Sequence, residues 1–146
     1  MNKIEKQVRD AYELWVKAMV VKWLDVRSVP FSREQPDWVY IGRRKGKPTM
    51  WGNPFEIGKH GTRDEVLEKY EVYYWSSGLD KYVHELRGWK LACFCAPKKC
   101  HGHFLVKQAN PFELWLDTLP FEIERGVRPN GWTDEERREY YESLSL

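Results

Sequence analysis

Three cysteines and two histidines are crowded into one short stretch of the chain. The segment 93–103 holds all three cysteines and two of the four histidines within eleven residues. Thiols and imidazoles bind metals, act as nucleophiles and exchange protons near neutral pH. The apolar residues before this segment predict a buried strand, and those after it begin a helical pattern. The cluster is therefore expected at a strand-to-helix turn, where open α/β folds usually bind their ligands.

Metal binding is the first chemistry that this cluster allows. Thiolate and imidazole are the preferred ligands of zinc. The candidate zinc ligands are Cys93, Cys95, Cys100 and His101. Cys93 and Cys95 are two residues apart in the expected strand, which separates them by ~6.5–7 Å along the backbone. Both sulfurs reach one ion only if the chain bends, so zinc is one interpretation among three.

A catalytic or anion-binding site is the second interpretation. If Cys100 and His101 begin a helix, the free N–H groups and the dipole of that helix favour a phosphate there. Lys98 and Lys99 would add positive charge, and Gly102 would keep the approach open. Such a site suits a nucleotide or a sugar phosphate, with Cys100 or His101 as the group that does the chemistry.

The third interpretation is structural. Cys93 and Cys95 are then small apolar residues of the core, and the histidines are surface or capping groups. For Cys93 alone we prefer the core role, whereas Cys100 and His101 together favour a functional role.

A second informative segment follows the strand expected at residues 38–41. Residues 43–61 form a long connection with little regular structure, and such connections are more often functional than idle. Arg43 and Arg44 supply positive charge, and Asn53 can orient a bound ligand through hydrogen bonds. Gly52 permits close backbone approach, and Trp51 offers a flat face on which a base stacks. The alternative is that Trp51 only covers the core, as aromatic side chains more often do.

Helices and strands that alternate along the chain must position these groups. Periodicity and capping residues predict helices over about residues 2–20, 62–76, 79–86, 100–109 and 133–141. Apolar runs predict strands near residues 23–29, 38–41 and 90–95. We expect an α/β fold with a small, mainly parallel sheet, helices on both faces and an irregular long loop after the second strand. Further short strands, or an irregular extended stretch, within residues 43–61 are expected to complete the sheet.

Composition and charge limit the class of protein. The length of 146 residues suits a single domain over residues 1–146. Residues 1–110 carry 20 basic and 13 acidic side chains, whereas residues 111–146, an acidic helical extension, carry 4 and 9. The basic part suits a phosphate-bearing ligand. Clustered, unpaired cysteines and the lack of a long apolar run predict a cytoplasmic protein with no membrane partner.

Four short motifs occur in a distinctive order, at residues 42–43 (Gly-Arg), 51–55 (Trp-Gly-Asn-Pro-Phe), 61–65 (Gly-Thr-Arg-Asp-Glu) and 91–103. Over about residues 22–110 they resemble a family of small bacterial and phage proteins known only as a domain of unknown function. The resemblance implies a small α/β domain often carried by phages, and it supplies no established reaction. In that family a tryptophan and an aspartate usually stand where this chain has Phe94 and His103.

These features together predict a phosphate-accepting pocket between the loop 43–55 and the turn 95–103. The expected ligand is a nucleotide, a nucleoside or a nucleic-acid end, and an enzyme would transfer or hydrolyse at a glycosidic or phosphate bond. The nearest carboxylates, none with a compelling spacing, are Asp25, Asp64 and Glu65. The alternative is a non-catalytic accessory protein that binds nucleic acid or inhibits a host protein, with the cysteine cluster structural or zinc-bound. Aromatic residues in the acidic extension would suit such an interface or a homo-oligomer.

Overall fold

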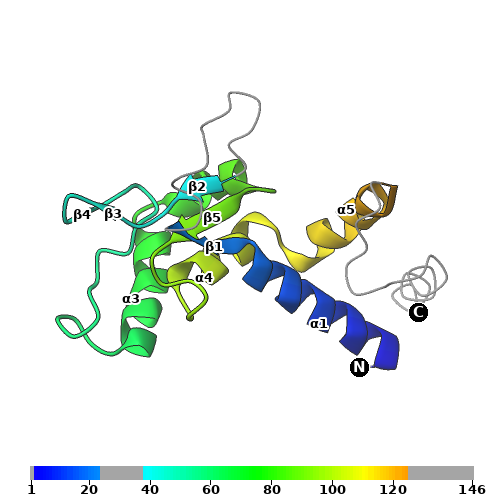
Figure 1. Cartoon of the computed structure of the whole chain (residues 1–146), viewed down its shortest axis with the longest axis horizontal. Helices are drawn as coiled ribbons and strands as arrows, with labels where there is room; N and C mark the ends of the chain where they lie inside the picture. Colours follow the sequence, from blue (N-terminus) through cyan, green and yellow to red (C-terminus); the bar gives the residue numbers. More distant parts are fainter. Residues whose placement is uncertain (1, 24–37, 125–146) are drawn as a thin grey trace. The chain divides into compact units, whose positions relative to one another are not determined.

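The computed structural model of the chain describes residues 2–23 and 38–124 (Figure 1). The chain divides into two compact units, a central unit of residues 16–110 and a terminal unit of residues 1–15 with 111–146. The prediction of a single domain stays a prediction. The helix expected at residues 133–141 lies outside the described residues.

Eleven helices and strands are described in order along the chain. They are α1 (Lys3–Ala18), β1 (Val20–Lys22), β2 (Trp38–Tyr40), β3 (Arg43–Arg44), β4 (Lys47–Pro48), α3 (Arg63–Ser76), η1 (Leu79–Lys81), η2 (Val83–Leu86), β5 (Lys90–Cys93), α4 (His101–Ala109) and α5 (Phe112–Glu124).

A small parallel sheet lies in the central unit and confirms the predicted α/β class. Its strand order is β1-β5-β2, and both outer strands run parallel to β5. Leu91 in β5 is paired with Val20 on one side and Val39 on the other. Leu91 and Ala92 are fully buried, as expected for a central parallel strand whose sequence is continuously apolar.

The first strand begins earlier than its apolar pattern predicts. α1 ends at Ala18 and β1 occupies residues 20–22, whereas the expected strand spans residues 23–29, of which 24–29 lie outside the described residues. The Leu91 N–H donates to the Met19 carbonyl at 2.7 Å, so the chain leaves the helix to join the sheet. Valines at this position fit a helix face and a strand equally well, so their pattern does not separate β1 from the end of the helix, and a strand over residues 24–29 stays a prediction.

The loop after β2 does not complete the sheet, contrary to expectation. β3 and β4 instead form a separate antiparallel hairpin. Its turn residues Lys45 and Gly46 have φ angles of 51° and 77°, the left-handed values that a two-residue hairpin turn requires. The structure also differs from the prediction at residues 79–86, where two short 3₁₀ helices, η1 and η2, replace the single expected helix.

Capping residues fix the two helices beside the sheet. Thr62 caps α3, since its hydroxyl accepts the Glu65 N–H and the Glu65 carboxylate accepts the Thr62 N–H. Cys100 caps α4, which contacts β5, β1, η2 and α3. The start of α3 occurs where the capping pattern predicts it, and the start of α4 agrees with the helix expected from about residue 100.

The terminal unit is built around aromatic rings. Tyr12 of α1 contacts Phe112 and Trp115 of α5, with ring centroids 5.4 and 5.2 Å apart. The Arg9 guanidinium lies over the Phe112 ring at 4.3 Å. Within the described residues, no helix combines the length and the apolar character needed to cross a membrane.

Candidate ligand-binding cavity

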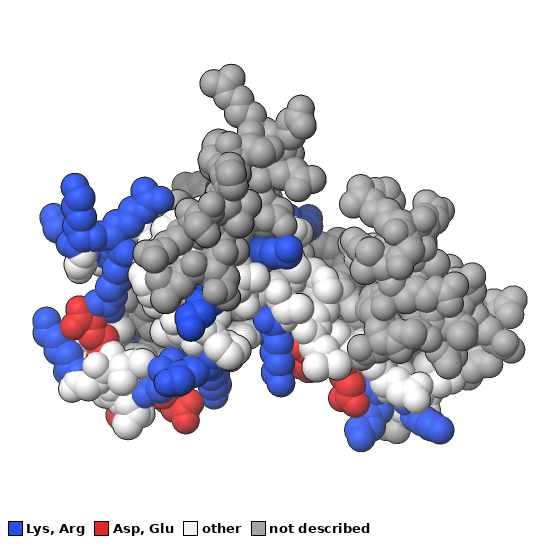
Figure 2. Space-filling model, in the orientation of Figure 1, with Lys and Arg blue, Asp and Glu red and all other residues white. Residues whose placement is uncertain are grey.

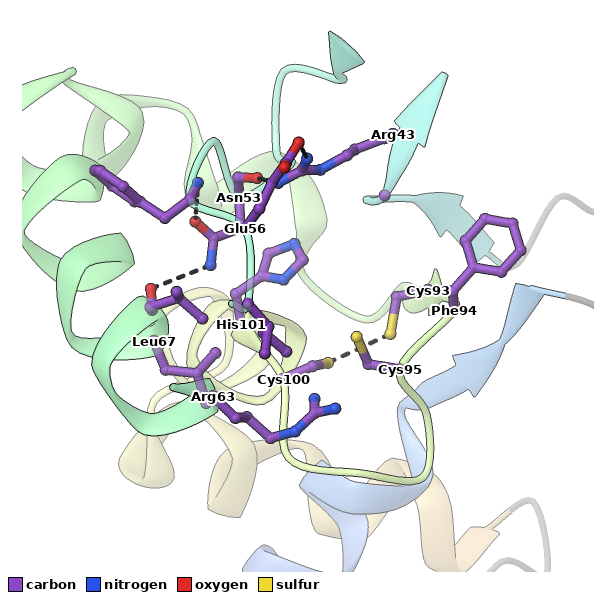
Figure 3. Close-up of a pocket in the computed structure, with 14 residues that line it drawn as sticks. Arg43, Asn53, Glu56, Arg63, Leu67, Cys93, Phe94, Cys95, Cys100 and His101 are labelled. Carbon is purple, nitrogen blue, oxygen red and sulfur yellow. Dashed lines mark hydrogen bonds and ion pairs between the residues drawn. The ribbon is translucent and has the colours of Figure 1, made fainter. Parts of the chain in front are cut away.

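A cavity of about 320 Å³ opens at the carboxyl ends of β2 and β5. Gly42 and Arg43 follow β2, Cys93 ends β5, and Phe94 and Cys95 follow β5. The remaining lining residues come from the loop before α3, the start of α3 and the start of α4: Asn53, Phe55, Glu56, Ile57, Arg63, Val66, Leu67, Cys100 and His101. Figure 3 shows the polar groups that face this space.

One wall of the cavity is an ion pair between Arg43 and Glu56. The second guanidinium nitrogen of Arg43 donates to the Asn53 carbonyl at 2.8 Å. The loop holds this arrangement, because the Asn53 side chain accepts the Phe55 N–H and donates to the Val66 carbonyl of α3. Asn53 is therefore a framework residue of the wall as well as a lining residue.

A second guanidinium reaches the cavity from the first turn of α3. Arg63 donates to the Lys99 carbonyl at 3.0 Å, and its guanidinium acts to lower the pKa of Cys95, although the net shift of that pKa is upward. Among the described residues, no carboxylate lies within ion-pair distance of Arg63. Because Glu56 neutralises Arg43, the charge that remains for a ligand is that of Arg63.

The three sulfurs gather on one side of the cavity (Figure 3). The sulfurs of Cys93 and Cys100 lie 3.3 Å apart. The hydrogen bond from Cys93, helped by the Gly102 N–H, holds the pKa of Cys100 below its usual value. The same hydrogen bond raises the pKa of Cys93 to about 11, and a hydrogen bond to Cys93 together with burial raises that of Cys95.

His101 belongs to the framework of the cavity. The residue is 8% exposed, and its Nε2 lies 2.9 Å from the Ile41 carbonyl, to which the neutral ring donates. Burial lowers the pKa of His101 from 6.5 to about 4. This geometry does not support the expectation that His101 exchanges protons near neutral pH.

The start of α4 is not an open anion site, contrary to expectation. The Gly102 N–H donates to the Cys100 sulfur at 3.3 Å, and the His103 N–H donates to the Cys100 carbonyl at 3.2 Å. Gly102 is buried, and a β-carbon there would lie 2.9 Å from the Ile41 side chain. The glycine thus permits close packing of α4 on the sheet rather than the approach of a ligand.

Trp51 and Gly52 also serve packing rather than binding. Trp51 is 6% exposed, and its carbonyl accepts the buried Tyr70 hydroxyl at 2.9 Å. The prediction of an exposed stacking face is therefore wrong, and the alternative of a core-covering ring is correct. A β-carbon on Gly52 would lie 2.9 Å from the Gly42 carbonyl and the Thr49 nitrogen.

The remaining predicted basic residues do not line this cavity. Arg44 is exposed on the β3–β4 hairpin, and Lys98 is exposed in the turn after β5. Lys99 pairs with Asp64 at 3.1 Å on the surface and borders a neighbouring cavity of about 220 Å³.

Sequence reasoning missed Glu56, Arg63 and Phe94 as cavity residues. Asp64 is on the surface, Glu65 caps α3, and Asp25 lies outside the described residues. The sequence gives only a weak indication that Glu56 belongs to the site. Glu56 directly follows the Trp-Gly-Asn-Pro-Phe motif, but its partner Arg43 is far away in the sequence, so no local pattern links the two. Arg63 belongs to the Gly-Thr-Arg-Asp-Glu motif, whose pattern predicts only the start of a helix.

The metal interpretation gains no geometric support from the described residues, among which no cluster of three or more Cys, His, Asp or Glu side chains is arranged to hold an ion. Zinc at Cys93, Cys95, Cys100 and His101 stays a prediction.

The fold and the cavity define a small α/β protein with a ligand-sized pocket at the carboxyl edge of a parallel sheet. The chain belongs to the family described as Domain of unknown function (DUF4326), which matches residues 25–111.

Two curated viral proteins are similar to this chain. The "Uncharacterized protein R718" of Acanthamoeba polyphaga mimivirus is 32% identical over an alignment of 83 residues, and the match covers 47% of this chain and 64% of that protein. The "Uncharacterized 12.4 kDa protein in nrdA-td intergenic region" of Enterobacteria phage T4 is 34% identical over an alignment of 68 residues, and the match covers 42% of this chain and 61% of that protein. The chain thus spans less than two thirds of either relative. No solved structure matches.

Proposed function

We propose that the cavity binds a nucleotide or a related small molecule that joins a phosphate to an aromatic ring. The observation that carries this proposal is the position of the cavity, at the carboxyl ends of two neighbouring parallel strands. Ligands of open α/β sheets bind at this edge. A volume of about 320 Å³ also falls within the range of small-molecule sites.

The lining supplies a group for each part of such a ligand. The guanidinium of Arg63 matches a phosphate, because a planar guanidinium donates two parallel hydrogen bonds. Phe94 lines the cavity and is 56% exposed, so its ring replaces Trp51 as the candidate face for stacking a base. Glu56 provides the carboxylate that a reaction at a glycosidic or phosphate bond requires.

Calorimetric titration of the full chain with nucleosides, nucleotides, pentose phosphates and inorganic phosphate tests this proposal. Loss of a charge-assisted hydrogen bond costs ~1.5–3 kcal/mol, so Arg63→Ala is expected to weaken nucleotide binding by about 10- to 100-fold. Arg44→Ala is the matched control, because Arg44 is exposed and does not line the cavity. Absence of binding across the panel, or equal losses in both variants, contradicts the proposal. Chromatography of the same mixtures detects any released base or phosphate.

Nucleic-acid binding is the second candidate, and the β3–β4 hairpin favours it. Arg44, Lys45 and Lys47 are exposed on this hairpin, and Figure 2 shows basic side chains gathered there. A basic surface of this kind contacts phosphates without reading sequence. In the same pair of variants, Arg44→Ala would then weaken salt-dependent binding of an oligonucleotide, while Arg63→Ala would leave it unchanged.

A further inference from the structure

Two of the cavity thiols already touch each other. Cys93 ends β5 and Cys100 caps α4, and their sulfurs are 3.3 Å apart. Both side chains are buried, with 2% and 4% of their surface exposed, yet both line the cavity. A disulfide bond is about 2.05 Å long, so a small adjustment of these side chains brings the sulfurs to bonding distance.

The surroundings of the two sulfurs are unequal. The Cys100 sulfur accepts the Gly102 N–H and lies against the Cys93 thiol. The Cys100 sulfur also lies at the start of α4, and both this position and the Gly102 N–H favour a negative charge on this sulfur. Because the thiolate is the nucleophile in sulfur chemistry, Cys100 is the sulfur that reacts first.

We propose that Cys93 and Cys100 are a reversible dithiol–disulfide pair in the cavity wall, oxidised by a hydroperoxide small enough to enter the cavity. The Cys100 thiolate attacks the hydroperoxide, so that an S–O bond forms, the O–O bond breaks and an alcohol, or water from hydrogen peroxide, leaves after protonation. The Cys93 thiol then attacks the Cys100 sulfur, the S–S bond forms and water leaves. The two thiols lose two electrons and two protons in total, and the hydroperoxide is reduced.

The third thiol provides an internal control. Cys95 lines the same cavity and is more exposed than Cys93 or Cys100. Exposure alone would therefore favour oxidation of Cys95, whereas the proposal assigns the bond to the two buried sulfurs. The pair reacts whether or not the cavity binds a nucleotide, so this inference stands apart from the proposed function.

Mass spectrometry of the folded full chain tests the pair. After treatment with one equivalent of hydrogen peroxide and alkylation under denaturing conditions, we expect one alkylated cysteine and the loss of two hydrogen atoms, both reversed by dithiothreitol. Chymotrypsin cleaves after Phe94 and trypsin cleaves after Lys99, so the two enzymes together place the three cysteines on separate peptides and the linked pair identifies the bond. A bond that includes Cys95, a bond between two chains, or thiols that stay reduced until the protein unfolds overturns the proposal.

Serine variants give the matched comparison. Cys95→Ser is expected to form the bond as the natural chain does, and Cys93→Ser is expected to stop at a sulfenic acid that a dimedone probe labels at Cys100. Labelling at Cys95 instead overturns the proposal. If Cys93→Ser does not fold, the peptide map of the natural chain and of Cys95→Ser decides the question.

Discussion

Arg43 and Arg63 carry the same charge into one cavity, but their surroundings give them different roles. Arg43 is held by the Glu56 carboxylate and the Asn53 carbonyl, so its charge is balanced within the wall. Among the described residues, the guanidinium of Arg63 donates a hydrogen bond to the Lys99 carbonyl and pairs with no carboxylate. An anionic ligand therefore gains more from Arg63, whereas Arg43 keeps the loop and the end of β2 together.

Gly52 is a residue at which a single methyl group is expected to be costly. A β-carbon there would lie 2.9 Å from the Gly42 carbonyl, the Pro48 side chain and the Thr49 nitrogen. Two of these atoms belong to the backbone and move only with the loop. We expect Gly52→Ala to lower the free energy of unfolding by ~1–3 kcal/mol, the usual cost of overpacking, as measured by urea denaturation.

The control for this prediction is Gly46→Asn in the hairpin turn. No atom lies within 4 Å of the β-carbon that Gly46 would gain, and asparagine tolerates the left-handed conformation of this turn. An unfolding free energy for Gly52→Ala as high as that of Gly46→Asn would show that the loop adapts to the added methyl group.

At the scale of elements, the start of α3 matters most for the cavity. Arg63 is the first residue of α3, and the capping box of Thr62 and Glu65 fixes the direction in which this helix begins. Val66 and Leu67, one turn later, line the same cavity. The capping box thus stabilises the helix and also positions the charged and apolar parts of one wall.

Removal of the cap is expected to affect both stability and binding. Thr62→Ala deletes the hydroxyl that accepts the Glu65 N–H, and loss of such a cap costs about 1 kcal/mol. Nucleotide affinity should fall as well, because Arg63 lies next to the frayed residue. Thr62→Ser keeps the hydroxyl and should restore both properties in denaturation and calorimetry. If Thr62→Ala and Thr62→Ser have the same stability and the same nucleotide affinity, the capping box does not position Arg63.

Elements with strong local signals were predictable from the sequence, and the cavity was only partly so. The capping box at Thr62 and the apolar strand 90–93 depend on neighbouring residues, so the chain itself reveals them. The pair Arg43–Glu56 depends on how a long loop folds, which no local pattern encodes. The two roles weighed for Trp51 could not be decided for the same reason, because the direction in which a loop side chain faces depends on the fold of the whole loop.

At the scale of the whole molecule, one buried imidazole couples folding to pH. The pKa of His101 is about 4 in the folded protein, against 6.5 without burial. The unfolded chain therefore binds a proton near the upper value, whereas the folded chain does so only near the lower one. The stability contributed by neutral His101 is complete above the upper value and is lost as the pH falls toward the lower one.

Urea denaturation over a series of pH values measures this coupling. Each pH unit between the two pKa values is expected to remove up to about 1.4 kcal/mol from the free energy of unfolding. His101→Gln keeps an N–H donor for the Ile41 carbonyl but does not titrate, so its stability should depend less on pH in this range. Parallel curves for the two proteins would rule out His101 as the source.

The order of strands in the sheet bears on how the protein is made. β5 is the last strand of the sheet to be synthesised, yet it joins β1 and β2, which do not pair with each other. On the ribosome both early strands therefore lack their partner until residues 90–93 have emerged. Such distant pairing slows folding and leaves apolar edges open to aggregation. Among the described residues, a nascent chain stopped before residue 90 thus contains β1 and β2 but not the strand that pairs with both.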